Sequence, residues 1–165
     1  MVAVTFEAAD ARAALRNAIG QLEDMTPIYS SVGEYMVAAT KDRFQRGVSP
    51  SGAAWAPKKK STLDRYKRLG YGQPLKALWG PSGALRSTPF AQHSRNAVVI
   101  GSSLIYSGVM QEGAAKGAFG SDRRGRPIPW GRIPARAWLG ISAGDERAII
   151  ETVEEKLAIA IGEKS

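Results

Sequence analysis

Cysteine is absent from this chain of 165 residues, and His93 is its single histidine. Without cysteine, the chain has no disulfide scaffold, no thiolate zinc site and no thiol nucleophile. One histidine leaves little for a histidine-based metal site or a Ser-His triad. His93 stands between Gln92 and Ser94 in a predicted turn, with no acid–base partner at a fixed spacing, so a solvated side chain is expected there. These absences argue against several classes of enzyme.

Long apolar runs and the common catalytic motifs are also missing from the sequence. No uninterrupted apolar run approaches the roughly 20 residues of a membrane helix, and no basic segment precedes an apolar stretch at the start of the chain. There is no G-x-S-x-G elbow, P-loop, G-x-G-x-x-G or H-E-x-x-H motif. Acidic residues are scarce in the middle of the chain, which disfavours a carboxylate metal site there. We therefore expect a soluble protein made in the cytoplasm that is not an enzyme and uses no metal or cofactor.

Positive charge is plentiful but unevenly distributed. The formal net charge is +8 and the sequence pI is about 10.0. By segment the balance is −3 for residues 1–40, +10 for 41–95, −1 for 96–115, +5 for 116–136, zero for 137–140 and −3 for 141–165. The positive charge lies in two segments, and both ends of the chain are acidic. Such a pattern indicates which partners a protein binds rather than which fold it has. It predicts contact between the middle of the chain and an anionic surface, either nucleic acid or an acidic protein.

Residue spacing predicts an α+β fold in a single domain covering residues 1–165. The expected elements are a strand over 2–6, helices over about 8–24 and 26–46, a short helix over 61–69, a hairpin of 85–90 and 97–101, an extended segment over 133–141 and a helix over 145–161. Thr26 is the predicted N-cap of the second helix, Pro27 fits its first turn, and Gly47 ends it. The expected architecture has two N-terminal helices and one C-terminal helix packed on a small antiparallel sheet. Two long basic loops, about 47–83 and 113–132, extend from this body.

The two loops combine basic and aromatic side chains. In the first loop the basic run Lys58–Lys60 is followed by further cations, with tryptophan and tyrosine between them. Proteins that bind single-stranded nucleic acid use such side chains to neutralise phosphates and to stack on bases. The same composition is also found on a solvated surface that keeps a protein soluble. All four tryptophans, Trp55, Trp79, Trp130 and Trp138, lie in or beside the loops. Such aromatics either pin a loop to the body or anchor an interface, and the sequence leaves both alternatives open.

Four short segments in order carry a resemblance to a known family. They are FQRGVSPSGAAWAPKKKSTL (44–63), GALR (83–86), VIGSSLIYSGVMQEG (99–113) and IPARAWLGIS (133–142). With these segments, residues 1–160 resemble the phage virion morphogenesis family, the tail-completion proteins of Mu-like tailed phages. Two positions depart from its pattern: Met110 stands where a histidine is frequent, and Ala137 where a proline is common.

The resemblance implies a structural virion protein of the head–tail junction that completes the tail or neck. Such proteins form a ring around the DNA channel, here expected to be a hexamer or dodecamer, and join tail to head. The implied partners are copies of the chain, head-completion proteins, tail-terminator or tail-tube proteins, and the packaged DNA in the channel, with no membrane. The implied location is the virion, after assembly in the cytoplasm of the bacterial host. The alternative is a nucleic-acid-binding protein without sequence specificity that acts through its basic loops.

Two groups of residues are candidates for these contacts. The predicted structural or interface anchors are Trp55, Arg136, Trp138 and Leu139. The predicted surface for an anionic partner comprises Lys58, Lys59, Lys60, Arg123, Arg124 and Arg126, whose guanidinium groups can bind carboxylate or phosphate with two hydrogen bonds.

Overall fold

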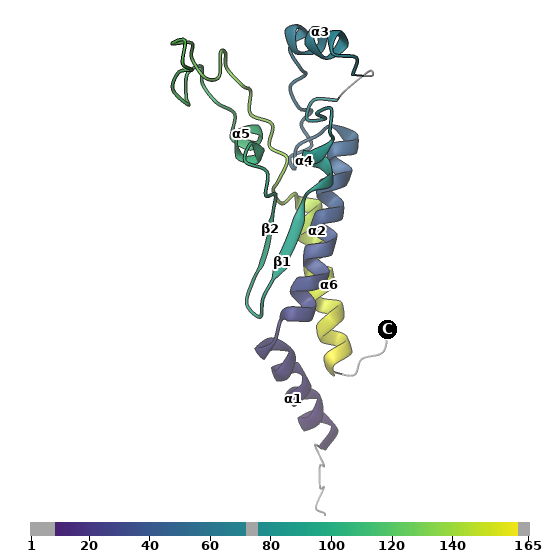
Figure 1. Cartoon of the computed structure of the whole chain (residues 1–165). Coiled ribbons are helices and arrows are strands. Elements are labelled where there is room, and N and C mark those ends of the chain that lie inside the picture. The colour runs from purple at the N-terminus through teal and green to yellow at the C-terminus, as the bar shows by residue number, and fades with distance from the viewer. Residues whose placement is uncertain (1–8, 72–75, 162–165) are drawn as a thin grey trace, which may run out of the picture.

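The structure is a computed structural model that describes residues 9–71 and 76–161. A helix of 21 residues forms the centre of an elongated molecule (Figure 1). The elements in order are α1 (Ala9–Glu23), α2 (Thr26–Arg46), α3 (Lys60–Arg68), α4 (Ala84–Ser87), β1 (Phe90–His93), β2 (Val98–Gly101), α5 (Ser107–Glu112) and α6 (Ala143–Ile161). The predicted α+β class is confirmed. The predicted strand over 2–6 lies outside the described residues.

The hairpin of β1 and β2 covers one side of α2. Its strands are antiparallel, with Ala91 opposite Ile100 and His93 opposite Val98. A Cβ atom on Gly33 of α2 would stand 2.8 Å from the Cβ of Ala91 and 3.1 Å from a methyl group of Val98. Only a residue without a side chain allows the hairpin backbone to come this close to the helix.

The C-terminal helix α6 runs back along α2 in the opposite direction (Figure 1). Between α2, the hairpin and α6 lies a lower core, in which buried α2 side chains meet partly buried ones of β2 and α6. Its buried members are Ile28, Val32 and Met36, and those packed against them include Val98, Ile100, Ile149, Val153 and Leu157. The residues of α2 and α6 recur at three- to four-residue spacing, so each helix places one apolar face in this core. Helix α1 packs chiefly against α6.

Both ends of α2 follow recognisable helix signals, with one correction. Gly47 adopts the left-handed conformation (φ 77°) and donates its N–H to the carbonyl of Arg43, as predicted for a terminating glycine. Thr26 was predicted as the N-cap but is the first helical residue, and Met25 holds the cap position without a side-chain hydrogen bond. The Asp24 carboxylate accepts the N–H of Thr26 at 3.1 Å instead. Hydrogen bonds from the side chain of Thr26 and from its backbone N–H hold the pKa of Asp24 below its ordinary value.

The segment between the first basic loop and the hairpin differs from its prediction. Residues 85–90 were predicted as a strand, yet Leu85 lies in α4 and only Phe90 begins β1. His93 therefore ends the strand rather than occupying the turn, although its side chain is exposed as expected. Helix α5 was not predicted, because its six residues carry no cap or periodic pattern long enough to detect. Residues 134–142 follow an irregular path after a single β-bridge between Ile133 and Ala114.

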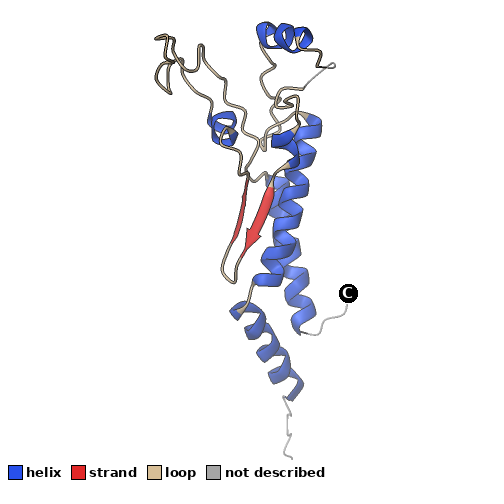
Figure 2. Cartoon of the chain, viewed as in Figure 1, coloured by secondary structure: helices blue, strands red, loops and turns tan. Residues whose placement is uncertain are grey.

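The two basic loops rise from the end of the body where α2 stops (Figure 2). The first arm, residues 47–83, contains α3, and the second arm, residues 113–132, is irregular apart from isolated β-bridges. They lie at the opposite end of the molecule from α1 (Figure 1). We call this the loop-bearing end.

Candidate interaction site at the loop-bearing end

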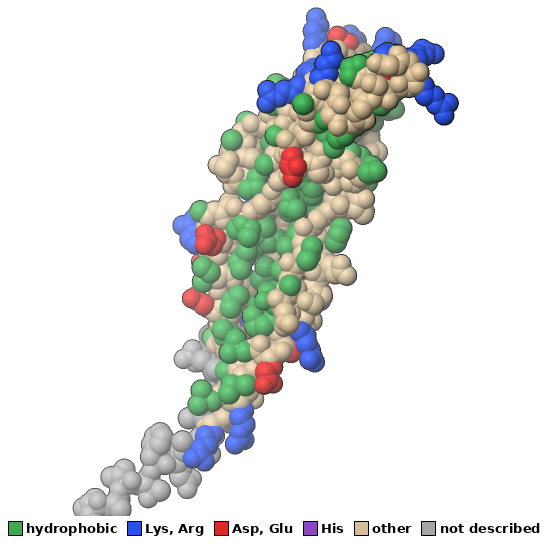
Figure 3. Space-filling model, turned by 90° about the vertical axis from the view of Figure 1, so that its left-hand side faces the viewer, with side chains coloured by type: hydrophobic (Ala, Val, Ile, Leu, Met, Phe, Trp, Pro, Cys, Tyr) green, Lys and Arg blue, Asp and Glu red, His purple; other side chains and the backbone are tan. Residues whose placement is uncertain are grey.

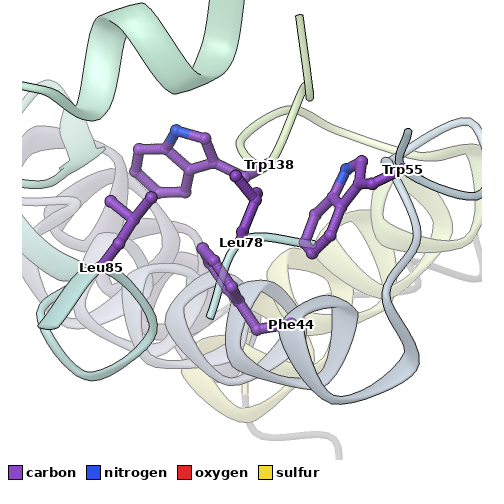
Figure 4. Packing of buried hydrophobic residues seen from close by; sticks show 5 residues of the cluster. All are labelled: Phe44, Trp55, Leu78, Leu85 and Trp138. Carbon is purple, nitrogen blue, oxygen red and sulfur yellow. The ribbon is translucent and has the colours of Figure 1, made fainter. Parts of the chain in front are cut away.

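An aromatic cluster closes the body beneath the two arms. Phe44, fully buried in the last turn of α2, meets the ring of Trp55 edge-on at 5.2 Å and the tilted ring of Trp138 at 5.9 Å between centroids (Figure 4). Leu78 and Leu85 complete the buried part of this upper core. Its members come from α2, the first arm, α4 and the segment before α6, so burial of these side chains joins four separate parts of the chain.

Both buried tryptophans also satisfy their indole N–H groups. Trp55 donates Nε1–H to the carbonyl of Ala137 at 2.8 Å, and Trp138 donates to the carbonyl of Ser107 at 3.1 Å. A buried indole N–H without a partner would cost free energy, so these bonds fix the ring positions as well as satisfying the donors. In the structure, Trp55 and Trp138 therefore pin the loops to the body.

Gln111 of α5 holds the irregular backbone segment that carries Trp138. Its side-chain oxygen accepts the N–H groups of Trp138 and Leu139 at 2.9 and 3.0 Å, and its amide donates to the carbonyl of Leu139 at 2.8 Å. Leu139 itself packs against the upper core. One amide side chain thus satisfies three backbone groups in a segment without regular secondary structure. Gln111 was not identified from the sequence as a functional residue. Its position in the QEG end of the 99–113 segment was the only signal that pointed to it.

Arg136 joins the segment before α6 to the first arm and to α5. Its guanidinium donates to the carbonyls of Ala56 and Pro57 at 2.7 and 3.0 Å, while its own N–H donates to the carbonyl of Met110. The residue is 8% exposed, and burial holds the pKa of its guanidinium below the ordinary value. In the structure Arg136 therefore has the position of an internal anchor, although its side chain also lines a cleft described below.

A buried ion pair joins α2 to the start of α6. Arg43 pairs with Asp145 and donates a second hydrogen bond to the carbonyl of Gly140 at 2.8 Å. Asp145 also accepts the N–H and hydroxyl of Ser142, both at 2.6 Å, and returns its own N–H to that hydroxyl. This reciprocal pattern is a capping box. Neither Arg43 nor Asp145 was singled out from the sequence, because nothing local links two residues a hundred positions apart.

The six predicted surface cations occupy different environments. Lys58 is half-buried and donates to the carbonyls of Lys76 and Ala77. Its burial, and the nearby charge of Arg136, lower the pKa of Lys58 to about 8. Lys59 donates to the carbonyl of Arg132 in the second arm at 3.1 Å, and Lys60 is exposed at the start of α3.

The arginines of the second arm surround Asp122. Arg126 pairs with this carboxylate at 2.7 Å and lies over the ring of Trp130, 4.8 Å from its centroid. Arg123 and Arg124 are exposed. Hydrogen bonds from Arg126 hold the pKa of Asp122 below its ordinary value. The side chains of Arg123 and Arg124 therefore extend from the tip of a loop whose shape Asp122 and Arg126 maintain.

The arms enclose a cleft of about 660 Å³, within the range of roughly 300–1,000 Å³ typical of ligand pockets. Tyrosine and tryptophan side chains from both arms and from the body line it: Tyr66, Trp79, Tyr106 and Trp130. Four cationic residues join them: Lys58, Lys59, Arg132 and Arg136. None of the described residues that line the cleft is Asp or Glu. The cleft combines apolar walls with positive charge, a combination suited to an apolar group flanked by anions.

Two searches of the described residues bear on other kinds of site. No described helix has both the length and the apolar character needed to cross a membrane. Within residues 9–71 and 76–161, no three His, Asp or Glu side chains gather as candidate metal ligands.

The sequence profile of the phage virion morphogenesis family matches residues 6–158. The chain belongs to this family. Its role is therefore in the structure or assembly of a phage particle, and the resemblance drawn from the four segments is confirmed at the level of the family. The match includes both arms and the cleft, so the loop-bearing end belongs to the family domain. No match was found among curated proteins or among solved structures.

Proposed function

We propose that this chain is a structural protein of the phage head–tail junction, which completes the tail or neck as a ring around the DNA channel and joins tail to head. The observation that carries the proposal, together with family membership, is the loop-bearing end. There, two arms fixed by buried aromatic and arginine anchors surround a cationic, aromatic cleft. A subunit that joins neighbours needs such projecting surfaces on a rigid body.

The proposed partners are further copies of the chain, a head-completion ring on one side, and a tail-terminator or tail-tube ring on the other. The exposed aromatics support protein contacts, since Trp130 is 68% exposed and Tyr106 39% exposed at the cleft. Large aromatic side chains are enriched among residues that dominate binding energy in interfaces.

A complementation experiment tests this function. A phage lacking the gene is supplied with the natural chain or with a variant in which Trp130 and Tyr106 are replaced by alanine, and particles are counted by electron microscopy. We expect separate heads and tails without the chain, complete particles with the natural chain, and strongly reduced joining with the variant. The matched control replaces Phe119, exposed on the same arm outside the cleft lining, with alanine. Complete particles in the absence of the chain would refute the proposal.

Exposed arginines at the tip of the second arm favour a second candidate, nucleic-acid binding without sequence specificity. Arg123 and Arg124 project there, and Lys60 is exposed on the first arm. If this is the function, the logarithm of the affinity for a DNA duplex falls linearly with the logarithm of salt concentration, and replacing Arg123 and Arg124 by alanine reduces the slope by about two. A chain that fails to bind DNA at low salt excludes this candidate.

A further inference from the structure

Two surfaces of opposite charge lie on different parts of the same chain. One is the cleft, where Lys59 and Arg132 are exposed and no described lining residue is acidic. The cationic groups of Lys59 and Arg136 have hydrogen bonds to carbonyl oxygens there. A carbonyl oxygen satisfies a donor without neutralising its charge, so the cleft keeps its positive charge.

The other surface is the outer face of α6, which we define as Glu146, Ile150, Glu151, Glu154 and Glu155. All five residues are exposed, and Ile150 remains 50% exposed although it is aliphatic. Glu146, Ile150 and Glu154 follow one another at four-residue spacing and so form one row on the helix. None of these glutamates forms an ion pair within the described part of the chain. An apolar side chain is thus bordered by carboxylates that have no ion-pair partner among the described residues, with one exposed cation, Arg147, on the same side of the helix.

We propose that the outer face of α6 in one copy docks into the arm cleft of a second copy. Ile150 enters between the aromatic walls, and the glutamates on either side meet Lys59 and Arg132. This is the helix-in-groove mode of recognition, with charges at the edge of the contact setting its orientation. The inference rests on the proposed function in one respect, that copies join one another, and it names the surfaces by which they do so.

The contact joins different chains, because α6 is held in its own body. Its opposite face, with Ile149, Val153 and Leu157, packs into the lower core against α2. The arms, whose side chains line the cleft, extend beyond the C-terminal end of α2 (Figure 1). One copy therefore presents its cleft while its neighbour presents the side of its body. A contact between two different surfaces is heterologous, and copies joined in this way form a ring where the rotation from one copy to the next closes.

The chemistry of the cleft favours a protein helix over a DNA duplex as its occupant. Both carry negative charge, but a DNA duplex presents phosphates without an apolar group to place against the aromatic walls. Figure 3 shows Lys and Arg side chains gathered at the loop-bearing end, while hydrophobic side chains follow the body below it. The cations at the tips of the arms suit phosphate, whereas the mixed lining of the cleft suits an isoleucine among glutamates.

Charge reversal in the full chain tests the contact. The cleft variant carries Lys59→Glu and Arg132→Glu, and the face variant carries Glu151→Lys and Glu154→Lys. Self-association is measured by sedimentation at low salt, and circular dichroism verifies folding. We expect each variant alone to associate at least about tenfold more weakly than the natural chain, because like charges then face each other. Mixing the two variants restores association, because every contact between them again joins opposite charges.

The control variant carries Glu23→Lys and Glu34→Lys, the same change of charge at exposed positions on α1 and α2. It associates like the natural chain, because neither changed residue lies in the cleft or on the outer face of α6. The proposal is overturned if the natural chain stays monomeric at millimolar concentration, if either reversal leaves association unchanged, or if the mixture fails to recover it. It is also overturned if the cleft variant loses binding to a short DNA duplex while self-association is unaffected.

The outcome is separable from that of the proposed function. Particles that are complete without the chain would refute a role in joining head to tail, yet leave the measured contact between copies in place. Conversely, unaltered self-association in the variants would refute the contact while complementation still demonstrated the role in joining.

Discussion

The buried ion pair between α2 and α6 makes the strongest prediction for stability. Arg43 and Asp145 expose only 3% and 6% of their side chains. Replacing Asp145 with alanine leaves a buried guanidinium without its counter-charge, which costs about 3–5 kcal/mol, and removes one half of the capping box, worth about 1 kcal/mol. We expect a total loss of about 5 kcal/mol, a third or more of the roughly 5–15 kcal/mol of a typical domain. The melting temperature should fall by about 10 °C.

The assay is urea denaturation followed by tryptophan fluorescence, because Trp55 and Trp138 lie in the upper core near the pair. Glu146→Ala is the matched control, since that side chain is exposed in the same turn of α6 and should change stability by less than about 0.5 kcal/mol. A loss below about 1 kcal/mol for Asp145→Ala would refute the reasoning.

A double variant separates the charge from the packing. Arg43→Met combined with Asp145→Leu removes both charges together, so it should recover much of the stability lost in Asp145→Ala. Acid provides an independent test. Burial alone would raise the pKa of Asp145, but the hydrogen bonds from Ser142 and the charge of Arg43 outweigh it and hold this pKa below 3.8. The stabilisation is therefore complete above about pH 4 and is lost as the pH falls through the lowered pKa of the folded chain.

Three further substitutions have defined outcomes. Gly33→Ala should lower the free energy of unfolding by about 1–2 kcal/mol in thermal denaturation, because the new methyl group would stand 2.8 Å from the Cβ of Ala91. Gly20→Ala has open space around it and should raise the free energy of unfolding by up to about 1 kcal/mol. Equal effects at the two sites would contradict the close approach of the hairpin. Thr40→Val should raise the free energy of unfolding by about 1 kcal/mol, because the buried Thr40 hydroxyl has no hydrogen-bond partner within the described part of the chain. A clear decrease of this free energy in urea denaturation would show that the hydroxyl does have a partner. Burial lowers the pKa of Lys58 from 10.5 to about 8 in the folded chain. Between about pH 8 and 10.5 the unfolded chain therefore binds more protons at Lys58 than the folded chain does. The free energy of unfolding of the natural chain, compared with that of Lys58→Met, should rise with pH across this range. A flat difference between the two chains from pH 8 to 10 would contradict the lowered pKa.

Helices with long, regular patterns were predictable from the sequence. The second and last helices were expected over 26–46 and 145–161 and are found over Thr26–Arg46 and Ala143–Ile161. Gly47 ends α2 because glycine adopts the required left-handed conformation at little cost. Local chemistry determines these features, and local chemistry is what a single sequence displays.

The segment around Leu85 shows where that reasoning fails. Residues 85–90 were predicted as the first strand of a hairpin, but Leu85 is buried in the upper core as part of α4, and the strand begins only at Phe90. Packing against distant residues outweighed a weak local preference over a few positions. Helix α5 was missed for a different reason, because its six residues are too few to show a periodic pattern.

What the sequence alone determined about this protein is its charge pattern, its long helices and its family. It placed the cations in two loops and the tryptophans beside them, but left open whether those tryptophans pin the loops or face a partner. The tertiary structure decided that, since Trp55 and Trp138 are buried in the upper core while Trp130 is exposed at the cleft. It also paired Arg43 with Asp145 and brought two basic loops together around one cavity. These outcomes depend on contacts between residues far apart in the chain, and such contacts leave no local pattern in a single sequence.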